Sequence, residues 1–97
     1  MTTFMMIMNF TDQGARSIKD TPKRTEAARQ LGKKMGVEIK QIYLTAGESD
    51  LVAFLEASDP DAMPRFALAL GSLGNVHTKT VRAWPEADFV RIVSELP

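Results

Sequence analysis

Few residues in this chain are suited to catalysis, and the clearest candidates are a histidine and an aspartate. His77 is the only histidine of the sequence, and imidazole is the side chain whose charge changes nearest to neutral pH. A proton-transfer role would therefore fall first to His77, with the carboxylate of Asp50 as the second candidate. The structural alternatives are that His77 is an ordinary surface residue of an edge strand and that Asp50 fixes the geometry of a turn.

Arg24 is the strongest candidate for ligand binding. On a helical wheel it falls among Ala28 and Leu31, within the apolar stripe rather than on the polar side. A guanidinium at such a position could hold a ligand carboxylate through two parallel hydrogen bonds. The alternative is that its long side chain extends to solvent, or pairs with an acidic residue such as Asp50 or Glu56.

Two aromatic side chains complete the candidate binding set. Tyr43, on the strand that pairs with the one after Asp50, could offer a hydroxyl to a cavity between sheet and helix. Trp84, which precedes Pro85, could line a pocket, although large aromatic residues more commonly fill a core or an interface. The predicted ligand-binding residues are therefore Arg24, Tyr43 and Trp84.

Composition excludes several kinds of chemistry. The sequence has no cysteine, which rules out disulfides, thiolate catalysis, cysteine-ligated zinc and iron–sulfur clusters. A single histidine argues against a metal site made of protein ligands alone. The six glycines match neither phosphate-binding nor dinucleotide-binding spacing. We therefore expect neither a metal nor a cofactor.

Charge is balanced overall but uneven along the chain. Twelve basic and twelve acidic side chains cancel, so no general attraction to nucleic acid or to an anionic membrane is expected. Residues 16–40 nevertheless carry eight basic and three acidic side chains. This segment is either a solvated helix with its flanking loops or a rim that attracts small anions. The N-terminus lacks the features of a signal peptide, so a cytoplasmic location is expected.

The spacing of apolar residues predicts a single domain over residues 1–97. Strands are expected at 4–10, 37–45, 51–57 and 76–84, and helices at 21–36, 61–74 and 85–97, with 11–20 as a loop. In the second strand, alternation places Val37, Ile39 and Tyr43 on one face. In the last helix, Phe89, Ile92, Val93 and Leu96 are expected to face inward. The order β-α-β-β-α-β predicts a ferredoxin-like α+β sandwich with sheet order 4-1-3-2 and an extra C-terminal helix.

The first and third strands are apolar on both faces, which suits the two central positions of this sheet. Two helices cover only one face of a four-stranded sheet, so apolar side chains on the other face would meet water. The C-terminal helix could shield part of that face. The stronger expectation is a homodimer formed by stacking the two sheets.

Several segments resemble the GYD domain family. The segment Gly47-Glu48-Ser49-Asp50-Leu51-Val52, followed by Phe54-Leu55-Glu56-Ala57 and Asp59-Pro60, looks like the GYD motif and the strand after it. The segments Thr11-Asp12-Gln13-Gly14, Gly36-Val37, Gly74-Asn75-Val76 and Ala83-Trp84-Pro85 resemble other landmarks of the family. Ser49 stands where the name-giving tyrosine would be, so a role that depends on that phenol is not expected here. The resemblance implies a ferredoxin-like domain of the dimeric α/β-barrel type and no settled activity.

Three functions follow from these observations. The first is a homodimeric domain that binds a small anionic or aromatic metabolite, with Arg24 as its anchor. The second is a cofactor-independent enzyme, by analogy with dimeric α/β-barrel monooxygenases and isomerases, in which His77 or Asp50 moves a proton. The third is an assembly subunit without a ligand.

Overall fold

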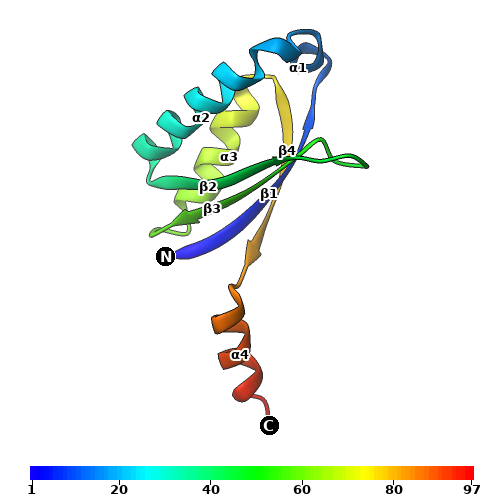
Figure 1. Cartoon of the computed structure of the whole chain (residues 1–97). Helices are drawn as coiled ribbons and strands as arrows, with labels where there is room; N and C mark the ends of the chain where they lie inside the picture. The colour runs from blue at the N-terminus through cyan, green and yellow to red at the C-terminus, as the bar shows by residue number, and fades with distance from the viewer.

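Four antiparallel strands form one open sheet in the order β2-β3-β1-β4, which confirms the predicted arrangement. The computed structural model describes all 97 residues (Figure 1). The strands are β1 (Thr2–Phe10), β2 (Val37–Leu44), β3 (Leu51–Ala57) and β4 (Val76–Ala83). The two strands that are apolar on both faces, β1 and β3, occupy the centre and pair with each other from Thr2 opposite Ala57 to Met8 opposite Leu51.

Two helices, α2 (Thr21–Met35) and α3 (Ala62–Ser72), lie side by side across one face of the sheet (Figure 1). Pro22 lies in the first turn of α2, where its missing N–H breaks no helical hydrogen bond. Gly36 ends α2 in the left-handed conformation with φ of 81°, as expected for a C-terminal glycine.

The hydrophobic core lies between this face of the sheet and the two helices. Its fully buried members come from β1, β2, β3 and α3, and they are Met6, Met8, Val37, Ala53, Leu55, Ala57, Ala62, Met63, Phe66 and Leu70. No polar or charged residue is fully buried. The core therefore holds the helices on the sheet by apolar packing alone.

A β-bulge in β2 decides which residues of that strand face the helices. Ile39 pairs with Leu55, but Gln41 pairs with the next partner along, Phe54, so Lys40 is an extra residue. Beyond the bulge the alternation is inverted, and Ile42 joins Ile39 on the helix side while Tyr43 lies opposite Val52. The expectation that Tyr43 shares a face with Val37 and Ile39 was therefore wrong.

The polar stretch between β1 and α2 was expected to be a loop, and that expectation was wrong. It forms a short helix and a 3-10 turn. The helix α1 (Asp12–Arg16) is followed by η1 (Ile18–Asp20). Thr11 begins α1, since its side-chain oxygen accepts a hydrogen bond from the Gly14 N–H at 3.1 Å. This element has no apolar stripe, so the spacing of apolar residues does not indicate it.

The last helix, α4 (Glu86–Ser94), extends away from the rest of the molecule (Figure 1). The molecule is accordingly 52 Å long, and its radius of gyration of 14.6 Å exceeds the roughly 12.5 Å of a compact domain of this length. The expectation that Phe89, Ile92, Val93 and Leu96 face inward was wrong, because all four remain exposed. The helix also leaves the uncovered sheet face unshielded. None of the helices combines the length and the apolar character needed to cross a bilayer.

Candidate functional site

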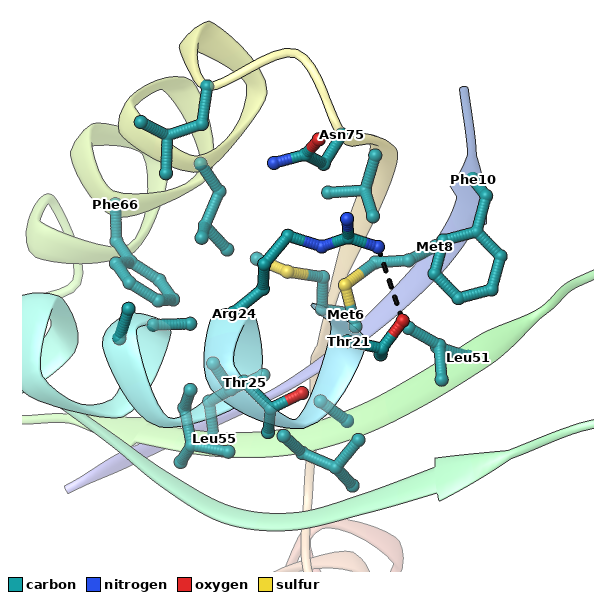
Figure 2. A pocket seen from close by; sticks show the side chains of 18 residues that line it. Met6, Met8, Phe10, Thr21, Arg24, Thr25, Leu51, Leu55, Phe66 and Asn75 are labelled. Carbon is teal, nitrogen blue, oxygen red and sulfur yellow. Dashed lines mark hydrogen bonds between the residues drawn. The ribbon is translucent and has the colours of Figure 1, made fainter. Parts of the chain in front are cut away.

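A cavity of about 130 Å³ lies between the sheet and the two covering helices (Figure 2). Fourteen of its eighteen lining residues are hydrophobic. Met6 and Met8 of β1 and Leu55 of β3 form its floor, and Phe66 of α3 closes its inner end. Such a space suits the apolar body of a small molecule.

The polar residues of the cavity gather on the first turns of α2 and at the turn before β4. They are Thr21, Arg24, Thr25 and Asn75. Only Arg24 among them was predicted from the sequence. Thr21 could have been found by its spacing, because it lies one helical turn before Arg24 and shares a face with it. Thr25, the next residue after Arg24, has no such signal.

Arg24 extends its guanidinium into the polar end of the cavity (Figure 2). Its Nη1 donates to the carbonyl and the hydroxyl of Ser17 at 3.0 and 2.9 Å. Its Nη2 donates to the carbonyl of Gly14 at 3.1 Å and to the hydroxyl of Thr21 at 3.2 Å. Four of the five guanidinium N–H groups are therefore used within the chain, and Nε–H has no hydrogen-bond partner.

No carboxylate neutralises this guanidinium. All five ion pairs of the protein lie elsewhere: Arg29–Glu26, Lys40–Glu38, Lys40–Glu56, Arg65–Asp59 and Arg91–Glu95. The alternative that Arg24 pairs with Asp50 or Glu56 was therefore wrong. The half-buried guanidinium is thus held by neutral hydrogen-bond acceptors, and its positive charge beside the apolar cavity has no counter-charge within the chain.

The segment that carries Ser17 and Gly14 is fastened to the turn before β4, at the same end of the cavity. The Thr11 N–H donates to the Asn75 carbonyl at 3.0 Å, and the Thr11 hydroxyl donates to the Gly74 carbonyl at 2.6 Å. The Gln13 side chain donates to the Leu73 carbonyl and to the Asn75 side chain at 3.2 and 2.9 Å. We call this segment, residues 11–17, the strap. It is hydrogen-bonded to Arg24 on one side and to Asn75 on the other, and both of these residues line the cavity.

Asp50 holds the start of β3 against β1 rather than lining the cavity. Its Oδ2 accepts a hydrogen bond from the Phe10 N–H at 2.9 Å. Its own N–H donates to the Met8 carbonyl at 3.0 Å and to the Asn9 side chain at 3.1 Å. This geometry matches the structural alternative for Asp50. Ser49, at the family's tyrosine position, lies in the preceding turn, where its carbonyl accepts from the Thr45 hydroxyl.

The remaining predicted residues do not meet at the cavity. Tyr43 is half exposed on the uncovered side of the sheet. His77 is exposed on the edge strand β4, opposite Asn9. Trp84 follows β4 with half its surface exposed, and the Arg82 guanidinium lies 4.8 Å from its ring centroid. The structure thus brings only Arg24 of the predicted set to the cavity.

The two carboxylates with shifted pKa values lie on the surface away from the cavity. A hydrogen bond from Gln30, with Arg29 nearby, lowers the pKa of Glu26. A backbone hydrogen bond from Asp61 and a side-chain hydrogen bond from Arg65 lower the pKa of Asp59. Nowhere do three or more potential metal-ligating side chains come together.

Comparisons with known proteins agree with this architecture. A protein of Thermus thermophilus named glutamine synthetase and cystathionine beta-lyase binding protein is 35% identical over 91 residues, which cover 93% of this chain and 96% of the relative. A feast or famine regulatory protein from M. tuberculosis, solved with L-methionine, superposes with a TM-score of 0.66 at 18% identity over 88% of this chain. This chain spans about half (51%) of that regulator.

A hypothetical protein from Pyrococcus horikoshii superposes with a TM-score of 0.57 at 20% identity, over 88% of this chain and 92% of that protein. These two solved structures share the ferredoxin-like fold. The sequence model of the GYD domain matches residues 4–93, which include all of β2, β3 and β4 and all of β1 except Thr2 and Thr3. The chain belongs to the GYD domain family.

Proposed function

We propose that this chain is a self-associating domain that binds a small organic anion with an apolar body. The ligand occupies the cavity between the sheet and α2 and α3, with its carboxylate at Arg24. The single observation that carries this proposal is the half-buried Arg24 guanidinium, which reaches an apolar cavity and has no acidic partner.

The hydrogen bonds of Arg24 define how a carboxylate would bind. Nε–H is free, and the contact of Nη2 with Thr21 is the longest of the four at 3.2 Å. These two nitrogens lie on one side of the guanidinium. A carboxylate that displaced the Thr21 hydroxyl could therefore accept from both in the side-on geometry of an arginine–carboxylate pair. The contacts to Ser17 and Gly14 would remain and hold the guanidinium in place.

Self-association is supported by the face of the sheet that the helices leave uncovered. The central strands direct Met5, Ile7, Val52 and Phe54 toward this face, since their register partners alternate with the buried core residues. A second copy stacked on it would remove these side chains from water. Two such sheets facing each other form the dimeric α/β-barrel arrangement. Light scattering at micromolar concentration tests this, and a monomer contradicts it.

Binding is tested by calorimetry with straight-chain and branched monocarboxylates of two to six carbons. We expect affinity for the acids and none for the matching primary alcohols, because only a carboxylate compensates the guanidinium. Arg24→Gln should weaken binding by at least about tenfold. Arg29→Gln is the matched control, since Arg29 lies on the exposed side of the same helix and pairs with Glu26.

Arg24 also fastens the strap, so a second variant separates binding from folding. Ala28 lines the cavity and lies one turn after Arg24. Ala28→Leu should fill the space and abolish binding while leaving every hydrogen bond of Arg24 intact. If no acid binds to the unaltered chain, or if Ala28→Leu binds as well as the unaltered chain, the proposal is wrong.

A second candidate is docking to a metabolic enzyme, which the 35% identical relative favours through its name and its near-complete coverage. The exposed apolar residues of α4 and of the open sheet face are available surfaces for it. The test is biolayer interferometry with purified glutamine synthetase and cystathionine beta-lyase from the organism that encodes this chain. Absence of binding up to about 100 μM would contradict this candidate.

A further inference from the structure

The apolar stripe of α4 is the largest feature that ligand binding at Arg24 leaves unexplained. The stripe consists of Phe89, Ile92 and Val93 on one side of this helix, together with Leu96, two residues beyond its end. Phe89 is 58% and Leu96 is 66% exposed. An amphipathic helix normally turns such a stripe to a core, yet α4 projects from the end of β4 with no element of its own chain beside it (Figure 1).

The junction between β4 and α4 directs the helix outward. Pro85 precedes the first helical residue and has φ of −55° and ψ of 157°, an extended conformation. Before it, the Arg82 guanidinium lies 4.8 Å from the centroid of the Trp84 ring, a cation–π contact that restricts the tryptophan. A proline and a restrained tryptophan limit how far α4 could fold back over its own sheet.

We infer that α4 is an arm that packs on a second copy of this chain, over the β4 side of that copy's uncovered sheet face. The inference rests on the self-association part of the proposed function and adds a contact that sheet stacking alone does not require. It gives the apolar stripe of α4 a partner surface, the β4 margin of the sheet face, beside the central strands that sheet stacking covers.

The exposed area of the arm is sufficient for such a contact. Trp84 and the four residues of the stripe together present on the order of 500 Å² to solvent, given that a large aromatic side chain alone contributes about 150 to 250 Å² when buried. Two arms, each covering a similar area of the other copy, exceed the roughly 1,200 Å² that a stable interface requires.

Charge favours the β4 side of the sheet face as the receiving surface. Glu86 and Asp88, in the first turn of α4, make no ion pair. On the uncovered face, β4 presents Lys79, which makes none either. The β2 side offers no unpaired positive charge of this kind, because its Lys40 already pairs with two glutamates. The acidic start of the arm is therefore complementary to the β4 side, where Lys79 is free to pair with it.

The absence of cysteine allows a direct test by disulfide trapping in the full chain. A Val93→Cys chain is coexpressed with a Val81→Cys chain that carries an affinity tag, so the mixed product is identified by mass. Val81 lies on the open face, opposite Met5. We expect the Val93→Cys and Val81→Cys chains to cross-link about tenfold more than Val93→Cys and Lys33→Cys chains. Lys33 is the control position because it lies on α2, which covers the opposite face of the sheet.

A substitution series measures the same contact without cross-links. Phe89→Asp should raise the dissociation constant of the dimer about tenfold. Ala87→Asp is the matched control, because it introduces the same charge in the same turn on the opposite side of α4 and should change the constant by less than about twofold.

The outcomes separate the arm from the rest of the proposed function. A dimer that forms no Val93–Val81 cross-link, or that tolerates Phe89→Asp, overturns the arm and leaves sheet stacking in place. Preferential Val93–Val93 cross-linking would show that the two arms pack on each other and would also overturn it. A chain that is monomeric before any substitution overturns both ideas, while carboxylate binding at Arg24 is measured independently.

Discussion

A Cβ atom on Gly14 would stand 2.1 Å from the carbonyl oxygen of Asn75. The two backbones are in direct contact where α1 crosses the turn before β4. This contact requires glycine because the obstacle is backbone rather than a movable side chain.

Gly14→Ala should therefore destabilise the protein by about 2 kcal/mol or more, because the strap must move away from Asn75. Urea unfolding measures the change. Gly71→Ala is the control, since nothing lies within 4 Å of its Cβ position near the end of α3. It should stabilise by up to about 1 kcal/mol through helix propensity. Equal effects of the two substitutions would contradict the close contact.

Asp50→Ala should lower stability by about 1 to 2 kcal/mol, because the Phe10 N–H loses its acceptor. Asp50→Asn should cost less, since its amide oxygen can still accept that hydrogen bond. Thermal unfolding of both variants measures the difference. If the two variants were equally stable, Asp50 would not be held in place for structure, and its candidacy as a proton acceptor would regain weight.

The Oγ1 atom of Thr80 is the one buried side-chain polar atom that lacks a hydrogen-bond partner. Thr80→Val keeps the shape of the side chain and removes the unsatisfied hydroxyl, so it should stabilise the protein by about 1 kcal/mol. Thr78→Val, two residues earlier on the same face of β4, is the comparison. The idea fails if Thr80→Val unfolds at lower urea concentration than the unaltered protein.

The pKa of Asp59 predicts a small pH dependence of stability. The Asp61 N–H and the Arg65 guanidinium hydrogen-bond to its carboxylate and lower its folded-state pKa. A lowered folded pKa stabilises the protein above the unfolded pKa of about 3.9, and this contribution is lost as the pH falls through the folded value.

Asp59→Asn should accordingly be less stable than the unaltered chain at pH 7, and the gap should narrow below about pH 4. The effect is small because the carboxylate is exposed to solvent. Unfolding curves across this range measure it. A gap that widened toward acidic pH would contradict the assignment.

The sheet order could be predicted from the sequence. The strands β1 and β3 are apolar on both faces, and such a strand suits a central position in the sheet. Gly36 marked the end of α2 for an equally local reason. The α1 helix could not be found in this way, since it is held by the Thr11 side chain and by backbone contacts to Gly74 and Asn75. These contacts join positions more than sixty residues apart.

The same limit applies to the candidate site. The position of Arg24 on the apolar stripe indicated that it reaches the interior, and it does. Its partners include the carbonyl oxygens of Ser17 and Gly14, and any residue could supply those. The exposure of α4 could not be predicted from the sequence either. An amphipathic pattern indicates that one face of a helix is covered, but it does not indicate whether the same chain or another chain covers it.

The extra residue in β2, Lys40, has a consequence for how such domains diversify. If Lys40 instead took a regular place in the strand opposite Phe54, every later residue of β2 would change face, so the Tyr43 phenol would turn from the outer surface of the sheet into the interior and Ile42 would turn outward. Loss of the bulge without loss of a residue therefore exchanges a side chain of the cavity for one of the open sheet face. Divergence by such a step would alter ligand preference and quaternary structure together.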